Sequence, residues 1–157
     1  WPLPVPENLW LALVTPAVEV PTAQARAVLP EQVPLKTMVG QTASVARLIS
    51  ALYRSDIPAM AAAMEADRVI EPARAHLMPK LQEVRRAAHL AGACGLVISG
   101  AGPTLAAVCD NPGAARTAAE AMEQVYAEAG YGATARACQV ATSGASLLDP
   151  ATAVTGL

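Results

Sequence analysis

The sequence predicts an α+β domain: a ferredoxin-like split βαβ plait with extra helices inserted after the first strand. Segments with strand and helix patterns follow one another as strand, several helices, two adjacent strands, helix and strand. The composition is 54% hydrophobic with 3% aromatic residues and no Phe, and the abundance of alanine favours helix. No repeat or linker divides the 157 residues. We therefore expect one domain over residues 1–157, with a frayed tail over residues 143–157.

The N-terminal elements are predicted from apolar runs and helix-capping residues. Residues 9–15 form a continuous apolar run typical of a buried strand. Thr22 is predicted to be the N-cap of a short helix over residues 23–29. Apolar residues near three-four spacing predict a long helix over residues 35–54.

The remaining elements follow in chain order. Asp56 is predicted to cap a helix over residues 58–66, and Pro79 to begin a helix over residues 80–91. A turn is expected at Asn111-Pro112-Gly113. The C-terminal part is predicted to hold a strand pair, a helix and a last strand, over residues 96–99, 104–109, 114–129 and 134–141.

Charge and cysteine content exclude several classes of protein. Eleven Lys and Arg against 13 Asp and Glu give a net charge of −2, so no basic stripe is available for nucleic acid. The longest apolar stretch is interrupted by glycine and proline, so we expect no membrane span. Three cysteines without CxxC or His-rich spacing indicate a reducing cytoplasm and predict no metal site.

Four groups of residues carry side chains or backbone groups that could bind or react with a ligand. Two clusters of titratable residues are interpreted as solvated helix surface: the acidic run Glu65, Asp67 and Glu71, and His89 beside Arg85 and Arg86. The third is the segment from Ser99 to Thr104, which contains Gly100 and Gly102. Its backbone N–H groups suit an anion nest, but a plain hairpin turn is equally compatible with the residues.

A threonine and two arginines form a candidate carboxylate site. Thr22 and Arg26 lie four residues apart, on one face of a helix. Arg74 follows Glu71-Pro72 and is expected just inside the start of a helical turn, where a cation opposes the helix dipole. A guanidinium fork suits a small carboxylate ligand, although surface arginines and a threonine cap would explain the same residues.

Three segments resemble homoserine kinase, a member of the GHMP small-molecule kinase superfamily. Residues 22–30 (TAQARAVLP) resemble its T-x-x-A-R-x-x-L-P segment, and residues 67–79 (DRVIEPARAHLMP) its D-x-x-x-E-P-x-R-x-x-L-x-P segment. Residues 91–95 (AGACG), running into residues 98–104 (ISGAGPT), are similar to the third GHMP motif, which is shared across the superfamily. The resemblance is to the C-terminal half and covers nearly the whole chain, so it implies the fold of a GHMP kinase C-terminal domain.

The resemblance implies transfer of the ATP γ-phosphate to the side-chain hydroxyl of L-homoserine, giving O-phospho-L-homoserine in threonine biosynthesis. It implies that Thr22, Arg26 and Arg74 contact homoserine, and it assigns no catalytic residue here. Support of the nucleotide phosphates is implied for the glycine turn, by Ser99, Gly100 and Gly102. A cytoplasmic homodimer is also implied.

The family's N-terminal phosphate loop, P-x-x-x-G-L-G-S-S-A, does not occur in this sequence. The resemblance therefore implies that ATP and Mg²⁺ are held mainly by an N-terminal half, and that this chain is inactive without that partner domain. The chain has no Met before Met38, so we expect it to be the C-terminal part of a longer polypeptide. The alternatives are another GHMP small-molecule kinase, or a stand-alone, non-catalytic amino-acid-binding ferredoxin-like module.

Overall fold

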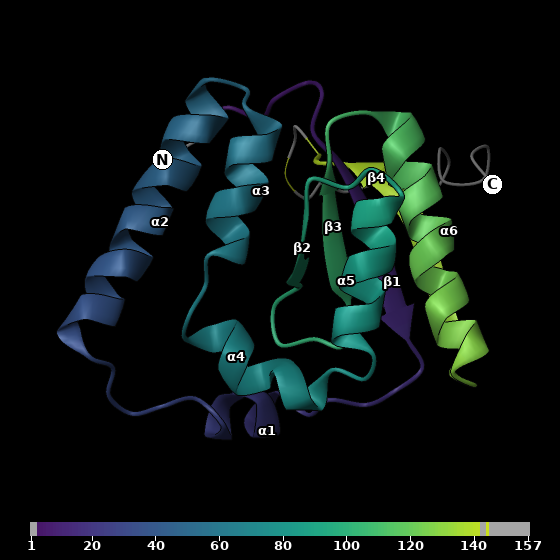
Figure 1. Cartoon of the computed structure of the whole chain (residues 1–157), viewed down its shortest axis with the longest axis horizontal. Coiled ribbons are helices and arrows are strands. Elements are labelled where there is room, and N and C mark those ends of the chain that lie inside the picture. The colour runs from purple at the N-terminus through teal and green to yellow at the C-terminus, as the bar shows by residue number, and fades with distance from the viewer. Residues whose placement is uncertain (1–2, 142–143, 145–157) are drawn as a thin grey trace, which may run out of the picture.

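The computed structural model describes residues 3–141 and residue 144. In this part of the chain, strands β1 to β4 lie at Trp10–Pro16, Gly95–Ile98, Leu105–Cys109 and Ala133–Gln139. The helices are α1 (Thr22–Ala27), α2 (Leu35–Tyr53), α3 (Ile57–Glu65), α4 (Ile70–Arg74), α5 (Leu81–Leu90) and α6 (Pro112–Glu128), and a 3-10 turn, η1 (Ala75–Leu77), follows α4. The predicted order of elements is confirmed (Figure 1).

The four strands form an antiparallel sheet in the order β2-β3-β1-β4. The first strand is internal, and Ala12 lies opposite Ala107 of β3 on one side and Ala137 of β4 on the other. The last strand thus pairs with the first, while β2 and β3 form a hairpin on the far side. This arrangement confirms the predicted split βαβ plait.

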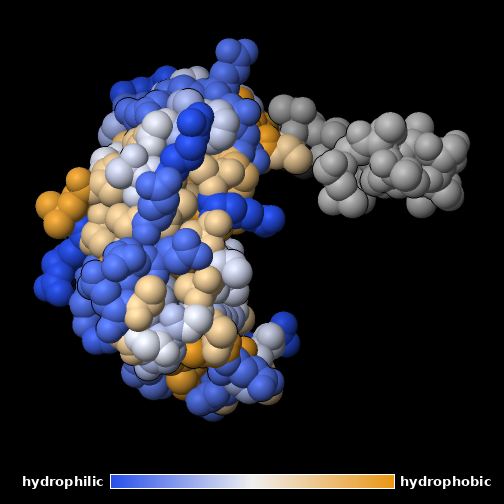
Figure 2. Space-filling model, turned by 90° about the vertical axis from the view of Figure 1, so that its right-hand side faces the viewer, coloured by the Kyte–Doolittle hydropathy of each residue, from blue (hydrophilic) through white to orange (hydrophobic). Residues whose placement is uncertain are grey.

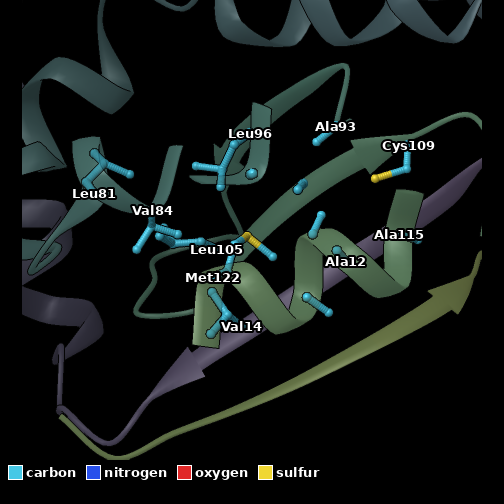
Figure 3. Packing of buried hydrophobic residues seen from close by; sticks show 14 of the residues in the cluster. Ala12, Val14, Leu81, Val84, Ala93, Leu96, Leu105, Cys109, Ala115 and Met122 are labelled. Carbon is cyan, nitrogen blue, oxygen red and sulfur yellow. The ribbon is translucent and has the colours of Figure 1, made fainter. Parts of the chain in front are cut away.

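The main core lies between one face of the sheet and the helices α5 and α6 (Figures 1 and 3). Alternate residues of β1 and β3 point into it, including Ala12, Val14, Leu105 and Cys109. Helix α6 contributes residues at helical spacing: Ala115, Ala118, Ala119, Met122 and Tyr126. Most of these side chains are small, so the helix backbone lies close to the sheet.

The other face of the sheet is covered in part by α3. A second core cluster joins Leu9 of the N-terminal segment and Val108 of β3 to apolar residues of α3. Gly95 of β2 allows this close approach, because a Cβ there would lie 3.0 Å from the Cβ of Ala61. Among the residues that the structure describes, no other helix packs extensively on this face. Figure 2, which views the α6 side, shows a concave outline along one edge of the molecule.

Helix α2 packs outside α3 and buries only Ala51 of its own residues. Its outer face is apolar and exposed, with Leu35 at 71%, Val39 at 58% and Tyr53 at 62% of full exposure. The predicted three-four spacing of apolar residues therefore marks this outer face, and α2 contributes little to the core.

Two of the predicted capping interactions differ in the structure. Thr22 is the first residue of α1 rather than its N-cap; Pro21 holds the cap position, and no side chain caps the helix. The turn expected at residues 111–113 is instead the start of α6, where Asn111 Oδ1 accepts a hydrogen bond of 2.8 Å from the Ala114 N–H. Asn-Pro-Gly satisfies turn and N-cap preferences alike, which explains the error.

One predicted helix cap is confirmed. Asp56 caps α3, because its Oδ1 accepts a hydrogen bond of 3.1 Å from the Ala59 N–H. No helix in the described part of the chain has the length and hydropathy needed to cross a bilayer. The tail expected over residues 143–157 lies outside the described residues, apart from Gly144.

Candidate functional site

Arg74 brings together the three segments that sequence analysis singled out. Its Nε donates to the Ala25 carbonyl of α1 at 2.9 Å, and its Nη1 donates to the Gly100 carbonyl at 2.9 Å. Helix α1 also carries Thr22 and Arg26, both exposed. The predicted carboxylate-binding residues and the glycine turn therefore meet at one edge of the domain, where α1 and α4 lie side by side (Figure 1).

The predicted position of Arg74 within its helix was wrong. Arg74 is the last residue of α4, not an early one, so its charge complements the helix dipole instead of opposing it. The helix begins earlier than expected because Asp67 satisfies its first N–H groups. Asp67 Oδ1 accepts from the Val69 and Ile70 N–H groups at 2.8 and 3.0 Å, and Oδ2 accepts from Glu71 N–H at 2.8 Å.

Asp67 is therefore part of the fold and not a solvated helix end. Partial burial alone raises the pKa of its carboxyl group, but the backbone donors of Val69, Glu71 and Ile70 and the amide of Gln41 lower it. The net result is a pKa below the ordinary value of 3.8. The Gln41 Nε2 group of α2 lies 2.7 Å from Asp67 Oδ1. The carboxylate is held charged by the donors around it.

The other members of the acidic run pair with Arg85, which also contradicts the prediction of a solvated surface. Arg85 Nη1 lies 3.2 Å from Glu65 Oε1, and Nη2 lies 2.7 Å from Glu71 Oε1. The three side chains are only 17–22% exposed. His89 is different: its Nε2 lies 3.2 Å from the same oxygen of Glu65, but its side chain is 40% exposed, so the solvated surface predicted for this histidine is confirmed.

The segment from Ser99 to Thr104 is a hairpin turn, and its Gly100 carbonyl accepts the hydrogen bond from Arg74. The Ser99 N–H donates to the Thr104 carbonyl at 2.9 Å, and the Gly102 N–H donates to the Ser99 carbonyl at 3.0 Å. Gly100 and Gly102 have φ of +60° and +85°, a region that favours glycine. A Cβ on Gly102 would also collide with the buried Met78 side chain. Glycine is therefore favoured at both positions, and most strongly at Gly102.

A hollow of about 480 Å³ lies beside this turn, on the open face of the sheet. Its lining is rich in hydroxyl groups and contains one guanidinium but no acidic side chain: Leu13, Thr15, Ser99, Thr104, Thr134, Ala135 and Arg136. The Thr15 and Thr104 hydroxyls are hydrogen bonded at 2.8 Å. Hydroxyl donors and one positive charge suit an anionic group.

Sequence analysis identified Ser99 but missed the other polar residues of this hollow. Thr15, Thr134 and Arg136 occupy strand positions that alternate with core-facing residues. That alternation was the signal that would have placed them on the open face.

Metal chemistry finds little support in the described residues. No group of three or more His, Cys, Asp or Glu side chains there is arranged to hold a metal ion. Magnesium prefers carboxylate and phosphate oxygens, and the lining of the hollow offers it no carboxylate. The lining of the hollow beside the glycine turn therefore suits an anionic group better than a metal ion.

The fold and this site define the class of protein. Residues 48–128, more than half of the chain, match the family described as "GHMP kinases C terminal", and the chain belongs to that family. A mevalonate kinase from L. major, solved in complex with R-mevalonate, has a TM-score of 0.68 at 15% identity over 91% of this chain and 46% of its own. That likeness shows the shared fold.

Within the family, the chain is similar to the C-terminal part of homoserine kinases. The homoserine kinase of Arabidopsis thaliana is 36% identical over 128 residues, which are 82% of this chain and 35% of that protein. That of Aeropyrum pernix is 40% identical over 76% of this chain and 39% of its own. A crystal structure of homoserine kinase from Cytophaga hutchinsonii has a TM-score of 0.84 at 36% identity, over 88% of this chain and 44% of that one.

These comparisons confirm the resemblance and the fold that it implied. They also show how much of each relative's length this chain covers. The chain spans less than half the length of each of these homoserine kinases.

Proposed function

We propose that this chain is the C-terminal part of a homoserine kinase, which transfers the γ-phosphate of ATP to the side-chain hydroxyl of L-homoserine. The observation that carries the proposal is the pair of hydrogen bonds from Arg74 to α1 and to the glycine turn. In this proposal, these bonds connect the segment that binds the acceptor, α1, to the segment that lies beside the phosphates, the glycine turn. Similarity of 36–40% to homoserine kinases over most of the chain supports the choice of acceptor.

The acceptor is held by Thr22, Arg26 and Arg74 in this proposal. Arg26 is exposed and forms no ion pair within residues 3–141, so its planar fork is free to bind a carboxylate through two parallel bonds. Arg74 already uses Nε and Nη1 for backbone carbonyls. It therefore offers the substrate its remaining Nη2 edge and its charge, and it also fixes the relative positions of α1 and the turn.

The phosphates of ATP lie beside Ser99, Gly100 and Gly102 in this proposal, with the hydroxyl-lined hollow next to them. Phosphoryl transfer needs little covalent chemistry from the protein and depends on positioning and charge stabilisation. The segments described here would supply orientation of the acceptor. An N-terminal domain of the same polypeptide would hold most of the nucleotide and the Mg²⁺ ion. The homodimer and the cytoplasmic location remain predictions of the family resemblance.

The test is an acceptor assay on the longest polypeptide that the gene encodes, with ATP and either L-homoserine or R-mevalonate. We expect phosphorylation of L-homoserine and no turnover by this chain alone. Preference for mevalonate would indicate another GHMP small-molecule kinase. Binding of homoserine by this chain, with no kinase activity from any product of the gene, would indicate a non-catalytic amino-acid-binding module.

A further inference from the structure

Helix α4 is held largely by polar contacts of its own residues. It has five residues, and none of them is buried. A helix this short is not stable by itself, and without a buried face the hydrophobic effect does little to place it. The next turn, η1, packs Ala75 and Leu77 against the main core, so the position of Arg74 depends on that packing and on the hydrogen bonds and ion pairs made by α4.

The N-terminal end of α4 is held by the Asp67 cap, which is itself fastened to α2. Gln41 donates to Asp67 Oδ1 through Nε2 at 2.7 Å and accepts from the Arg68 N–H through Oε1 at 3.2 Å. This double contact fixes the residues that lead into α4.

The middle of α4 is held by Arg85. Glu71, three residues before Arg74, accepts a bond of 2.7 Å from Arg85 Nη2. The guanidinium is fixed by a second carboxylate, because Nη1 bonds Glu65 at the end of α3. The same Glu65 oxygen accepts a bond of 2.9 Å from the Leu96 N–H of β2, which ties the network to the sheet.

Helix α5, which carries Arg85, is well packed against the main core. Helix α5 buries Leu81, Val84 and Ala88 in the main core, so the stem of Arg85 starts from a well-packed element. Its Nε is buried and has no hydrogen-bond partner among the described residues. An unsatisfied buried donor is costly, and the two ion pairs made by the forked guanidinium offset that cost.

We infer that Arg85 is a positioning residue for homoserine binding: it holds Glu71, and through α4 it sets the place of the Arg74 guanidinium between α1 and the glycine turn. The inference rests on the proposed function for the identity of the acceptor. In this inference Arg85 contacts neither homoserine nor ATP. Its effect reaches the acceptor through Arg74.

The first experiment compares Arg85→Met with the wild type in the longest polypeptide that the gene encodes. Met keeps the apolar stem but removes both ion pairs. We expect the KM for homoserine to rise about tenfold, as when one charge-assisted contact is weakened, with the KM for ATP unchanged. Arg85→Lys, whose compact ammonium cannot fork between two carboxylates, should fall between the two. Glu71→Gln, which removes one ion pair but keeps an acceptor oxygen, is the milder variant if Arg85→Met does not fold.

The matched control is Arg54→Met. Arg54 also forms an ion pair, with Asp56 at 2.9 Å, but it is exposed and has no bond to the Arg85 network; the connection between α2 and α3 that carries it lies at the opposite end of these helices from α4 (Figure 1). This variant should leave both KM values unchanged. Equal effects of Arg54→Met and Arg85→Met would overturn the inference, because they would reflect a general loss of charge.

A double variant separates positioning from a merely structural role. If Arg85 acts through Arg74, the homoserine KM of Arg74→Ala/Arg85→Met should match that of Arg74→Ala alone. If the fold-changes in homoserine KM of the two single variants multiply in the double variant, Arg85 acts independently of Arg74 and the inference is overturned.

Hydrogen exchange provides a readout that does not depend on the acceptor. The amides of residues 69–71, 73 and 74 should lose protection in Arg85→Met and keep it in Arg54→Met. Unchanged protection in both variants would overturn the inference. A wild-type protein that does not phosphorylate homoserine would instead overturn the proposed function, while the exchange experiment would still decide whether Arg85 positions α4.

Discussion

Helices α6 and α4 are held in place by different forces. Helix α6 has 17 residues and buries five side chains against the sheet. Helix α4 has five residues, buries none, and is held by a cap, an ion pair and the two bonds of Arg74. Burial is non-directional and tolerates small shifts, whereas each polar contact fixes a distance and an angle. The first kind of contact builds a scaffold, and the second places a binding group.

The comparison predicts that the two regions respond differently to the same treatment. Changes on the α6 side should alter global stability with little effect on substrate affinity. Changes on the α4 side should alter substrate affinity more than stability.

The largest effect is expected from removing a core side chain of α6. Met122→Ala should lower the free energy of unfolding by about 2–5 kcal/mol, the range for a large-to-small change in a core. Denaturant unfolding of the 157-residue chain measures it. Met38→Ala on the exposed face of α2, where the side chain is 51% exposed, is the matched control and should change stability by less than about 0.5 kcal/mol. Similar losses in both variants would mean that the α6 side is not the main core.

A smaller effect is expected at the Asp67 cap. Asp67→Ala removes the acceptor for three backbone N–H groups and should cost about 0.5–2 kcal/mol, the range for a helix cap. Hydrogen exchange should show the loss at residues 69–71. Global destabilisation with no local change there would contradict the account of α4.

Asp67 also gives the chain a defined dependence on pH. Its folded-state pKa lies below 3.8, so the charged carboxylate contributes stability that is present above pH 3.8 and is lost as pH falls through the lowered pKa. Unfolding of the wild type and of Asp67→Asn, measured from pH 6 to pH 2.5, should differ most at the upper end of this range. A constant difference would show that ionisation of Asp67 is not linked to folding.

The smallest effect concerns a thiol on the packed side. Burial, with smaller contributions from Cys94 and Asp110, raises the pKa of Cys109 to about 11, and its side chain is part of the main core. At pH 8 it should react with iodoacetamide only as fast as the core opens. The rate of Cys109 alkylation should rise in Met122→Ala and be unchanged in Asp67→Ala. Rapid labelling of native Cys109 would show that this side is less tightly packed than described.

Sequence patterns predicted the packed region better than the polar one, and the reason is physical. The period of the apolar residues in α6 and the continuous apolar runs of β1 and β3 are local patterns, so these elements and their order were predictable. Local capping chemistry was predictable only in part. Asp56 was correctly identified as a cap, whereas Asn111 was assigned to a turn.

The polar network was not predictable because its partners are far apart in the sequence. Glu65 and Glu71 lie 20 and 14 residues from Arg85, and their pairing depends on how α3, α4 and α5 pack. Read alone, such residues resemble a solvated surface. The family resemblance named Arg74, but only the folded arrangement links it to Ala25 and Gly100.

The most direct test of the account is the kinetics of Arg74→Ala in the longest polypeptide that the gene encodes. Arg74 should contribute to the acceptor site both by its charge and by holding α1 against the glycine turn. The KM for homoserine should therefore rise by an amount equivalent to about 1.5–3 kcal/mol, the range for a hydrogen bond to a charged group. The KM for ATP should stay nearly constant. An equal loss for both ligands, or no loss for homoserine, would contradict the account.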